Sequence, residues 1–297
     1  MNLDLLRERA RIVSAIRRFF DGEGFVEVET PVRIAAPAPE EHIDCPPVEG
    51  GGFLRASPEL QMKKLLSAGL DLIYQIGPCF RDGENGSRHN PEFTMIEWYR
   101  RNATYLDIGK DLERLLASLA PFSATAVDRC RRLSVREAYR QYAGWDPWEA
   151  FDQDRFDFDM ATKVEPAIKA IGGGVFLMDY PPQAASLARL SSSIPNSQFS
   201  ISNPQSRCYA ERWEFYWNGM ELANCFTELC DGDEQTRRFE KAKAARQALG
   251  EADYPIDREF LAELPKIGSA AGVALGVDRL VMVLTGACDI HEVRVAP

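Results

Sequence analysis

The sequence lacks the signatures of several large enzyme classes. Only three histidines occur, and His42 and His291 have no partner at metal-ligand spacing, which argues against zinc-dependent hydrolysis. The motifs GxSxG, GxxxxGKS/T and GxGxxG are all missing. Serine hydrolases, P-loop enzymes and dinucleotide-binding proteins are therefore disfavoured, because each class depends on its motif to build the site.

Long apolar runs, paired cysteines and excess positive charge are missing as well. No run approaches the roughly 20 apolar residues of a membrane helix, and the charged N-terminal segment does not resemble a secretion signal. Seven cysteines form an odd set without a CxxC pair, which indicates a reducing cytoplasm. Lys and Arg number 35 against 45 Asp and Glu, a net charge of −10, which argues against coating nucleic acid.

The pattern of apolar residues predicts an α+β fold. Helices are expected at 3–21, 58–68, 105–118, 134–142, 160–171 and 234–249, with a last segment, 273–284, running from strand into helix. Strands are expected at 25–31, 72–76, 93–99, 175–180, 211–217 and 220–229, with loops at 35–52, 78–91 and 144–159. Because strands and helices do not alternate regularly, the sheet is expected to be antiparallel and flanked by helices.

The segment FRDGENGSRHNPEFTMIEWYR, residues 80–100, is the densest in groups that could carry chemistry. Arginine in such a loop suits a bidentate clamp on phosphate oxygens. A strand beginning at Phe93 would place Phe93, Met95, Glu97 and Tyr99 on one face. That face could stack a base and pair a cation, although a solvated loop with scattered charges is the alternative.

A second candidate segment is GVALGVDRLVMVLTG, residues 272–286. A glycine-rich turn from strand into helix allows a ligand to approach the backbone and directs Arg279 into a cleft. The alternative is an ordinary glycine turn with Asp278 as a cap.

The third candidate is the hairpin ERWEFYWNGMELANCFTELCD, residues 211–231. Without a bulge, one face of its second strand would carry Met220, Leu222, Asn224, Phe226 and Glu228, and Glu221 would point the other way. Glu214 and Glu221 are a pair of carboxylates of the kind that holds Mg²⁺ beside nucleotide phosphates. A half-exposed hairpin with acidic outer positions is the alternative.

In chain order, the segments 80–100, 211–231 and 272–286 resemble motif 2, the strands before motif 3, and motif 3 of a lysyl-type class II aminoacyl-tRNA synthetase. FVEVETPVR, residues 25–33, resembles motif 1, usually a dimer-interface element. The resemblance implies one class II catalytic domain over residues 1–297, with a helical insertion at about 105–180. The chain starts directly at this domain, so we expect no anticodon-binding domain. This short form, with SPELQMKKL at 57–65, resembles the elongation factor P–(R)-β-lysine ligase family.

At the ATP end of the site, the resemblance implies that Arg81 holds the α-phosphate and the amino-acid carboxylate. Phe93 would stack on adenine with Arg279 on the other side, which makes Arg81 and Arg279 the expected catalytic residues. Further ATP contacts are implied for Asp82, Gly83, His89, Asn90, Glu221 and Leu222. Mg²⁺ would be held by Glu214 and Glu221.

At the amino-acid end, the resemblance implies that Ser57, Pro58 and Glu59 contact the substrate amino group. The side-chain ammonium would be bound by Glu97, Tyr99 and Glu228. The rest of the pocket wall would consist of Asn224, Phe226 and Ala274.

Two positions depart from the resembled pattern. Relatives commonly have glutamate where this chain has Gly83, with Glu84 following one residue later. Ala274 stands where lysyl-tRNA synthetases usually have glycine, and its extra methyl group suits a substrate whose amino group is moved by one carbon.

The resemblance implies a cytoplasmic, homodimeric enzyme that uses ATP and Mg²⁺ to convert lysine or (R)-β-lysine to an aminoacyl-adenylate. The activated group would then be transferred to a lysine side chain of elongation factor P, the expected protein partner. Two alternatives remain at this point: a shortened lysyl-tRNA synthetase paralogue that acylates tRNA or another amine, and a catalytically silent regulatory paralogue.

Overall fold

The computed structural model of the 297-residue chain describes residues 2–40, 43–123, 130–191 and 208–295. Within these residues a mixed sheet has the strand order β1-β4-β5-β11-β10-β9-β7-β6, and β8 pairs with β9. Its strands are β1 (Val26–Glu27), β4 (Leu72–Phe80), β5 (Glu92–Arg101), β6 (Arg131–Ser134), β7 (Gly174–Tyr180), β8 (Leu190–Ser191), β9 (Tyr209–Trp217), β10 (Met220–Thr227) and β11 (Ala270–Gly276). A separate ribbon pairs β2 (Arg33–Ile34) with β3 (Phe53–Leu54). The α+β prediction is confirmed.

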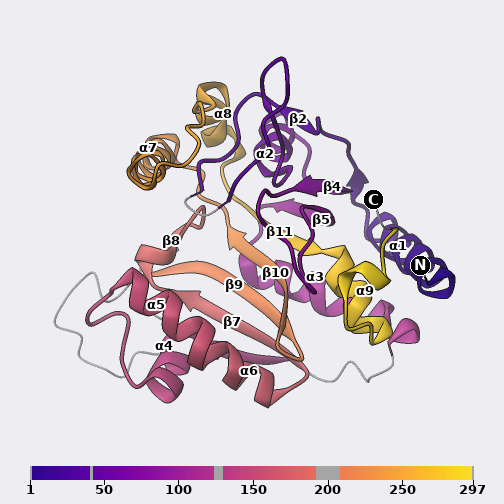
Figure 1. The fold of residues 1–297 in the computed structure, drawn as a ribbon. Helices are drawn as coiled ribbons and strands as arrows, with labels where there is room; N and C mark the ends of the chain where they lie inside the picture. The colour runs from indigo at the N-terminus through magenta and orange to yellow at the C-terminus, as the bar shows by residue number, and fades with distance from the viewer. Residues whose placement is uncertain (1, 41–42, 124–129, 192–207, 296–297) are drawn as a thin grey trace.

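Helices flank the sheet on both faces (Figure 1). They are α1 (Leu3–Gly22), α2 (Glu59–Ser67), α3 (Tyr105–Ser118), α4 (Val135–Ala138), α5 (Gln153–Asp159), α6 (Glu165–Ile171), α7 (Gly232–Leu249), α8 (Arg258–Glu263) and α9 (Val277–Thr285). In the part of the chain that the structure describes, no helix is both long enough and apolar enough to cross a membrane.

The sheet differs from the predicted antiparallel one at its edges. The central strands pair antiparallel, but β1 pairs parallel with β4, and β6 pairs parallel with β7. The prediction of a strand over 25–31 is wrong for most of its length, because only Val26–Glu27 form a strand. The chain leaves the sheet at Thr30, whose backbone N–H and hydroxyl both donate to Gln75, and Pro31 has no N–H to continue the ladder.

The middle of the chain also differs from its predicted elements. The predicted loop 144–159 contains α5, whose first turn is capped by Asp152. The segment expected to be a helical insertion, about 105–180, also contributes β6 and β7 to the main sheet. The domain organisation as a whole stays a prediction.

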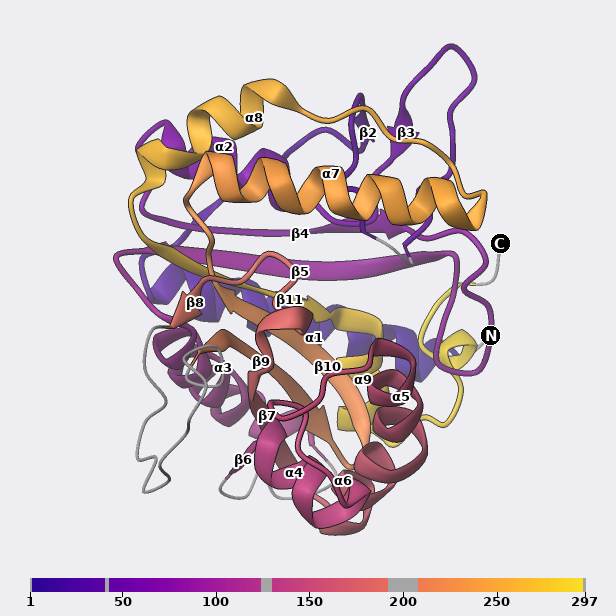
Figure 2. The same cartoon turned by 90° about the vertical axis from the view of Figure 1, so that its left-hand side faces the viewer.

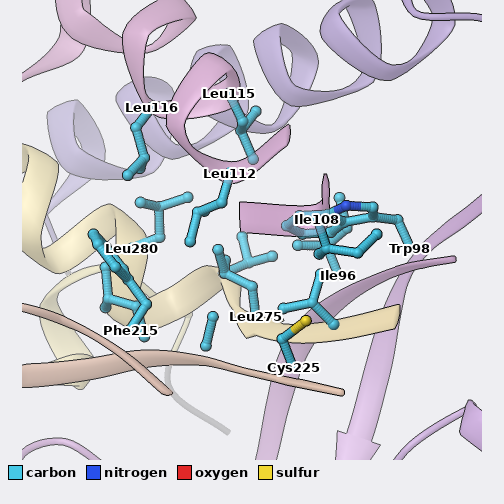
Figure 3. Packing of buried hydrophobic residues seen from close by; sticks show 14 of the residues in the cluster. Ile96, Trp98, Ile108, Leu112, Leu115, Leu116, Phe215, Cys225, Leu275 and Leu280 are labelled. Carbon is cyan, nitrogen blue, oxygen red and sulfur yellow. The ribbon is translucent and has the colours of Figure 1, made fainter. Parts of the chain in front are cut away.

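The main core lies on the face of the sheet covered by α1, α3 and α9. Helix α1 buries Ile12, Ile16 and Phe20 at four-residue spacing, the period of one helix face. Figure 3 shows the leucines of α3 pointing toward the sheet, where Ile96 and Trp98 of β5 are completely buried. These side chains occupy the apolar face of the central strands. A binding site can therefore form only on the opposite face of the same strands.

Among the residues that the structure describes, helices cover the opposite face only at its two ends. Figure 2 shows α2, α7 and α8 at one end and α4, α5 and α6 at the other. At the first end, Leu60 and Leu66 of α2 pack with Phe239 and Phe260. At the second, α4 to α6 form a cluster with β7 and β9. The central strands β5, β11 and β10 therefore present their polar face between the two helical groups.

A β-bulge in β10 changes which of its side chains reach this face. Glu221 lies opposite Tyr216, whereas Ala223 lies opposite Phe215, so Leu222 is an extra residue in the strand. The prediction that Leu222 shares a face with Asn224 assumed no bulge, and it is wrong.

The bulge rotates one half of β10 relative to the other. Glu221 now lies on the same face as Asn224 and Phe226, because their partners across the hairpin alternate regularly along β9. Leu222 is buried in the main core, and Met220 packs against that core. Both glutamates of the predicted Mg²⁺ pair, Glu214 and Glu221, therefore point to the open face.

Candidate active site

The strand register aligns the predicted site residues in rows across the open face. Glu97 of β5 lies opposite Ala274 of β11, which lies opposite Asn224 of β10. The neighbouring row consists of Tyr99, Gly272 and Phe226. Residues opposite one another in a sheet point to the same side, so segments far apart in the sequence form one continuous surface.

This surface forms part of a cavity of about 320 Å³. Most of the predicted site residues line it: Ser57, Glu59, Arg81, His89, Asn90, Phe93, Glu97, Tyr99, Glu221, Leu222, Asn224, Phe226, Glu228, Ala274 and Arg279. Pro58, Asp82, Gly83 and Glu214 are not among its lining residues. The predicted face of Phe93, Met95, Glu97 and Tyr99 is confirmed, whereas the role of each residue stays a prediction.

Arg81 is held at one side of the cavity, directly after β4. Its guanidinium lies over the Phe93 ring, 5.2 Å from the ring centroid, and Glu84 approaches it at 3.5 Å. The turn between them requires Gly83 to adopt φ +75°, a conformation that favours glycine. This geometry gives a physical reason for glycine at the position where the resembled pattern has glutamate.

Arg279 connects the two arginine segments. Its Nη1 donates to the backbone oxygen of Glu221 at 3.0 Å, and its Nη2 lies 2.6 Å from His89 Nε2. Burial and the nearby Arg279 charge lower the pKa of His89, so the imidazole is neutral and can accept this hydrogen bond. Arg279 therefore joins the β10 bulge to the loop between β4 and β5.

Asp278, the residue before Arg279, connects the start of α9 to neighbouring elements. Its carboxylate accepts hydrogen bonds from Arg9 at 2.6 Å, Arg294 at 2.6 Å and the backbone N–H of Thr94 at 2.8 Å. Asp278 was expected only as a helix cap, yet it ties α9 to α1 and to β5. The start of α9, and with it Arg279, is held in place by this network.

Glu97 is completely buried at the opposite end of the cavity. The Ser57 hydroxyl donates to its Oε1 at 2.6 Å and the Tyr99 hydroxyl donates to its Oε2 at 2.9 Å. Burial, followed by the charge of Glu59, raises the pKa of Glu97 to about 8. A carboxyl group with this pKa ionises readily once a cation arrives.

Lys63 is a residue at this end that the sequence interpretation missed. Its ammonium is 1% exposed and pairs with Glu59 and with Glu228, the latter at 2.5 Å. Desolvation opposes its charge, but the two carboxylates raise the pKa of Lys63. The i,i+4 spacing from Glu59 on a helix was the available signal, so Lys63 could have been found.

Gly272 leaves the space that the Tyr99 ring occupies. A Cβ at this position would lie 2.2 Å from Tyr99 and 2.9 Å from Glu228 Oε1. No side chain fits there, because real Cβ contacts are much longer. Gly272 is therefore required because Tyr99 and Glu228 pack closely against it at the cavity floor. Its conformational freedom is less important.

The carboxylate pair predicted for Mg²⁺ is asymmetric. Glu214 accepts hydrogen bonds from Arg212 at 2.6 Å and from the Tyr216 hydroxyl at 2.7 Å. Burial and then the charge of Glu214 raise the pKa of Glu221. The two carboxylates thus lie close enough to repel one another, and Glu221 faces the cavity.

A model of the tRNA synthetases class II (D, K and N) family matches residues 2–297. The chain belongs to this family. Several similar proteins are named elongation factor P–(R)-β-lysine ligase. Those from Pasteurella multocida and Proteus mirabilis are 35% and 36% identical, and each alignment covers 98% of this chain and 94% of the relative. The Photobacterium profundum relative is 34% identical, with 98% of this chain and 95% of the relative covered. The resemblance to the ligase family is confirmed.

Proposed function

We propose that the chain is an ATP-dependent ligase that activates (R)-β-lysine as an aminoacyl-adenylate and transfers it to a lysine side chain of elongation factor P. The observation that carries the proposal is a single cavity with arginines at one end and buried acidic groups at the other. Arg81 and Arg279 suit phosphate oxygens, whereas Glu97 and Glu228 suit an ammonium group. The names of the relatives support the same acceptor and the same amino acid.

In the first step, the substrate carboxylate attacks the α-phosphate of ATP and pyrophosphate leaves. Arg81 would neutralise charge on the α-phosphate, and Arg279, held by His89 and the β10 bulge, would act on the nucleotide from the other side. Phe93 offers its ring to the adenine. The contribution of this chain is positioning and charge stabilisation, which are the main requirements of phosphoryl transfer.

The carboxylates present fit Mg²⁺. It usually takes one or two carboxylates and completes its shell with phosphates and water, and the residues that would hold it are Glu221 and Glu214. A cation there would counteract the burial and the Glu214 charge, which together raise the pKa of Glu221. Among the described residues no group of three or more acidic, histidine or cysteine ligands occurs, so the nucleotide would supply further oxygens. When bound, Mg²⁺ would offset phosphate charge.

The pocket wall supports the choice of a β-amino acid. Ala274 lies between Glu97 and Asn224 across the strands, so its methyl group adds to the wall beside the predicted ammonium partner. We propose that this methyl favours a substrate whose amino group is displaced by one carbon. A cytoplasmic location, a homodimer and a single catalytic domain are parts of the same proposal.

Mass spectrometry of elongation factor P tests the proposed function. Incubation with the enzyme, ATP and (R)-β-lysine is expected to add one β-lysyl group to the factor, and (S)-α-lysine is expected to add less. The Arg279→Ala variant serves as a control with strongly reduced activity. Charging of tRNA with no change in the factor's mass would contradict the proposal and favour the tRNA-acylating paralogue.

Substrate binding is expected to depend on the ionisation of Glu97. In the empty cavity the pKa of Glu97 is about 8, so the carboxyl group is protonated at lower pH. A bound ammonium favours the carboxylate, so binding below pH 8 should release a proton, and affinity should weaken as the pH falls.

Isothermal titration calorimetry in two buffers of different ionisation enthalpy measures this proton release. Glu97→Gln should reduce the buffer dependence for (R)-β-lysine and leave the binding of ATP unchanged. Substrate affinity that increases as the pH is lowered from 8 would refute the assignment of Glu97.

A further inference from the structure

Glu40 is a cavity residue to which the sequence assigned no role. It lies in the segment between β2 and β3, and its half-buried side chain lines the cavity. Within residues 2–40, 43–123, 130–191 and 208–295, its carboxylate forms no hydrogen bond and no ion pair. An acidic group in this position is available to a cation that enters with a ligand.

The backbone of Glu40 is held firmly in place. Arg246 of α7, 1% exposed, donates to the carbonyl oxygens of Glu40 at 2.8 Å and Ile43 at 3.2 Å, and to Asp44 Oδ1 at 2.6 Å. The backbone N–H of Asp82 donates to the carbonyl oxygen of Asp44 at 2.8 Å. The segment is thus tied both to α7 and to the loop that follows Arg81.

The charged groups around Glu40 place it between the two ends of the cavity. They are Glu59 and Lys63 of α2, Arg81 after β4, and Arg212 of β9. Burial and Glu59 raise the pKa of Glu40, and the three cations oppose this shift. Glu59 lies at the predicted amino-group end and Arg81 at the predicted phosphate end, so Glu40 has charged neighbours from both ends, between which the reacting carboxyl carbon is expected.

The other acidic groups of the cavity already have partners. Glu59 and Glu228 share the Lys63 ammonium, Glu84 pairs with Arg81, and Glu97 accepts from two hydroxyl groups. Transfer to a lysine side chain requires one further proton acceptor, because an ordinary lysine, with a pKa of about 10.4, enters as an ammonium ion.

We propose that Glu40 binds the ammonium of the acceptor lysine and takes its proton. This inference rests on the proposed function, of which it specifies the second step. The acceptor ammonium gives one proton to Glu40, and the freed nitrogen lone pair forms a C–N bond with the adenylate carbonyl carbon. The bond from that carbon to the phosphate oxygen breaks, AMP leaves with the electron pair, and the new amide nitrogen releases its second proton to water.

The test compares Glu40→Gln with the native enzyme in each half-reaction. ATP–pyrophosphate exchange with (R)-β-lysine is expected to stay within about twofold, whereas single-turnover transfer to elongation factor P at neutral pH should fall by about a hundredfold, the usual contribution of a general base. Transfer by the variant should recover as the pH is raised, because more of the acceptor lysine is then neutral.

Hydroxylamine separates proton removal from a general loss of reactivity. It is largely uncharged at neutral pH and attacks adenylates directly, so hydroxamate formation by Glu40→Gln should match that of the native enzyme. Glu49→Gln is the matched control, since Glu49 is an exposed residue of the same segment, outside the cavity.

Distinct outcomes overturn the inference and the proposed function. Equal loss of exchange and transfer in Glu40→Gln would make Glu40 a ligand of the amino acid, and unchanged transfer would leave it without a role in proton removal. Either result would overturn the inference while the ligase function stands. Failure of the native enzyme to modify elongation factor P would instead refute the proposed function.

Discussion

Replacing Arg279 with alanine is expected to lower lysine-dependent ATP–pyrophosphate exchange by at least about tenfold, and Arg81→Ala is expected to do the same. Both side chains are donors aimed at the part of the cavity where phosphate charge would develop, and removal of one such donor commonly costs about a hundredfold in rate. Arg279→Ala also removes the contact between the β10 bulge and the loop that carries His89, so the apparent KM for ATP should rise.

A surface arginine provides the control for this experiment. Arg11 on α1 is 71% exposed and pairs only with Glu8 among the described residues, so Arg11→Ala should leave exchange unchanged. Exchange is the appropriate measurement, because it reports the first half-reaction without the acceptor protein. If neither Arg81→Ala nor Arg279→Ala reduced exchange by tenfold, the assignment of the ATP end would be wrong.

Lys63→Met is expected to lower the free energy of unfolding by about 3–5 kcal/mol, because it leaves the buried carboxylates of Glu59 and Glu228 without their cation. Urea unfolding at neutral pH measures the loss. The loss should shrink as the pH is lowered. Burial raises the pKa of Glu228 to about 7 even beside Lys63, so its carboxyl group becomes protonated as the pH falls and then no longer needs a partner.

The neighbouring Lys64 offers a matched control. It is 28% exposed and pairs with Asp257 and Glu259, so Lys64→Met should cost no more than about 1 kcal/mol. Adding Glu228→Gln to Lys63→Met should restore part of the stability, since one buried charge is removed with its partner. If Lys63→Met and Lys64→Met lowered the free energy of unfolding equally, the buried ion pairs of Lys63 would contribute no more to stability than the partly exposed pairs of Lys64.

Much of the site could be predicted because its chemistry is local in the sequence. Strand alternation correctly placed Phe93, Met95, Glu97 and Tyr99 on one face, since a regular strand has only two faces. That Phe93 and Arg279 lie at one site was implied by the resemblance to class II synthetases and not by local chemistry.

Features that depend on three-dimensional neighbours could not be predicted in this way. Glu40 lies in a segment rich in proline and alanine, and contacts with residues distant in the chain, such as that of Arg246 with its backbone, hold it beside the cavity. The parallel pairing of β1 with β4 joins strands that are distant in the chain. The bulge at Leu222 leaves no distinctive residue type, because a buried leucine suits a regular strand as well.

That bulge also constrains how relatives of this chain should be aligned. Glu221 and Asn224 share a face only because one unpaired residue lies between the two halves of β10. Deleting one residue between them would give a regular strand in which the two positions, now two residues apart, still share this face. A one-residue gap at this point in an alignment is therefore compatible with the same two side chains on the open face, although the number of residues between them differs.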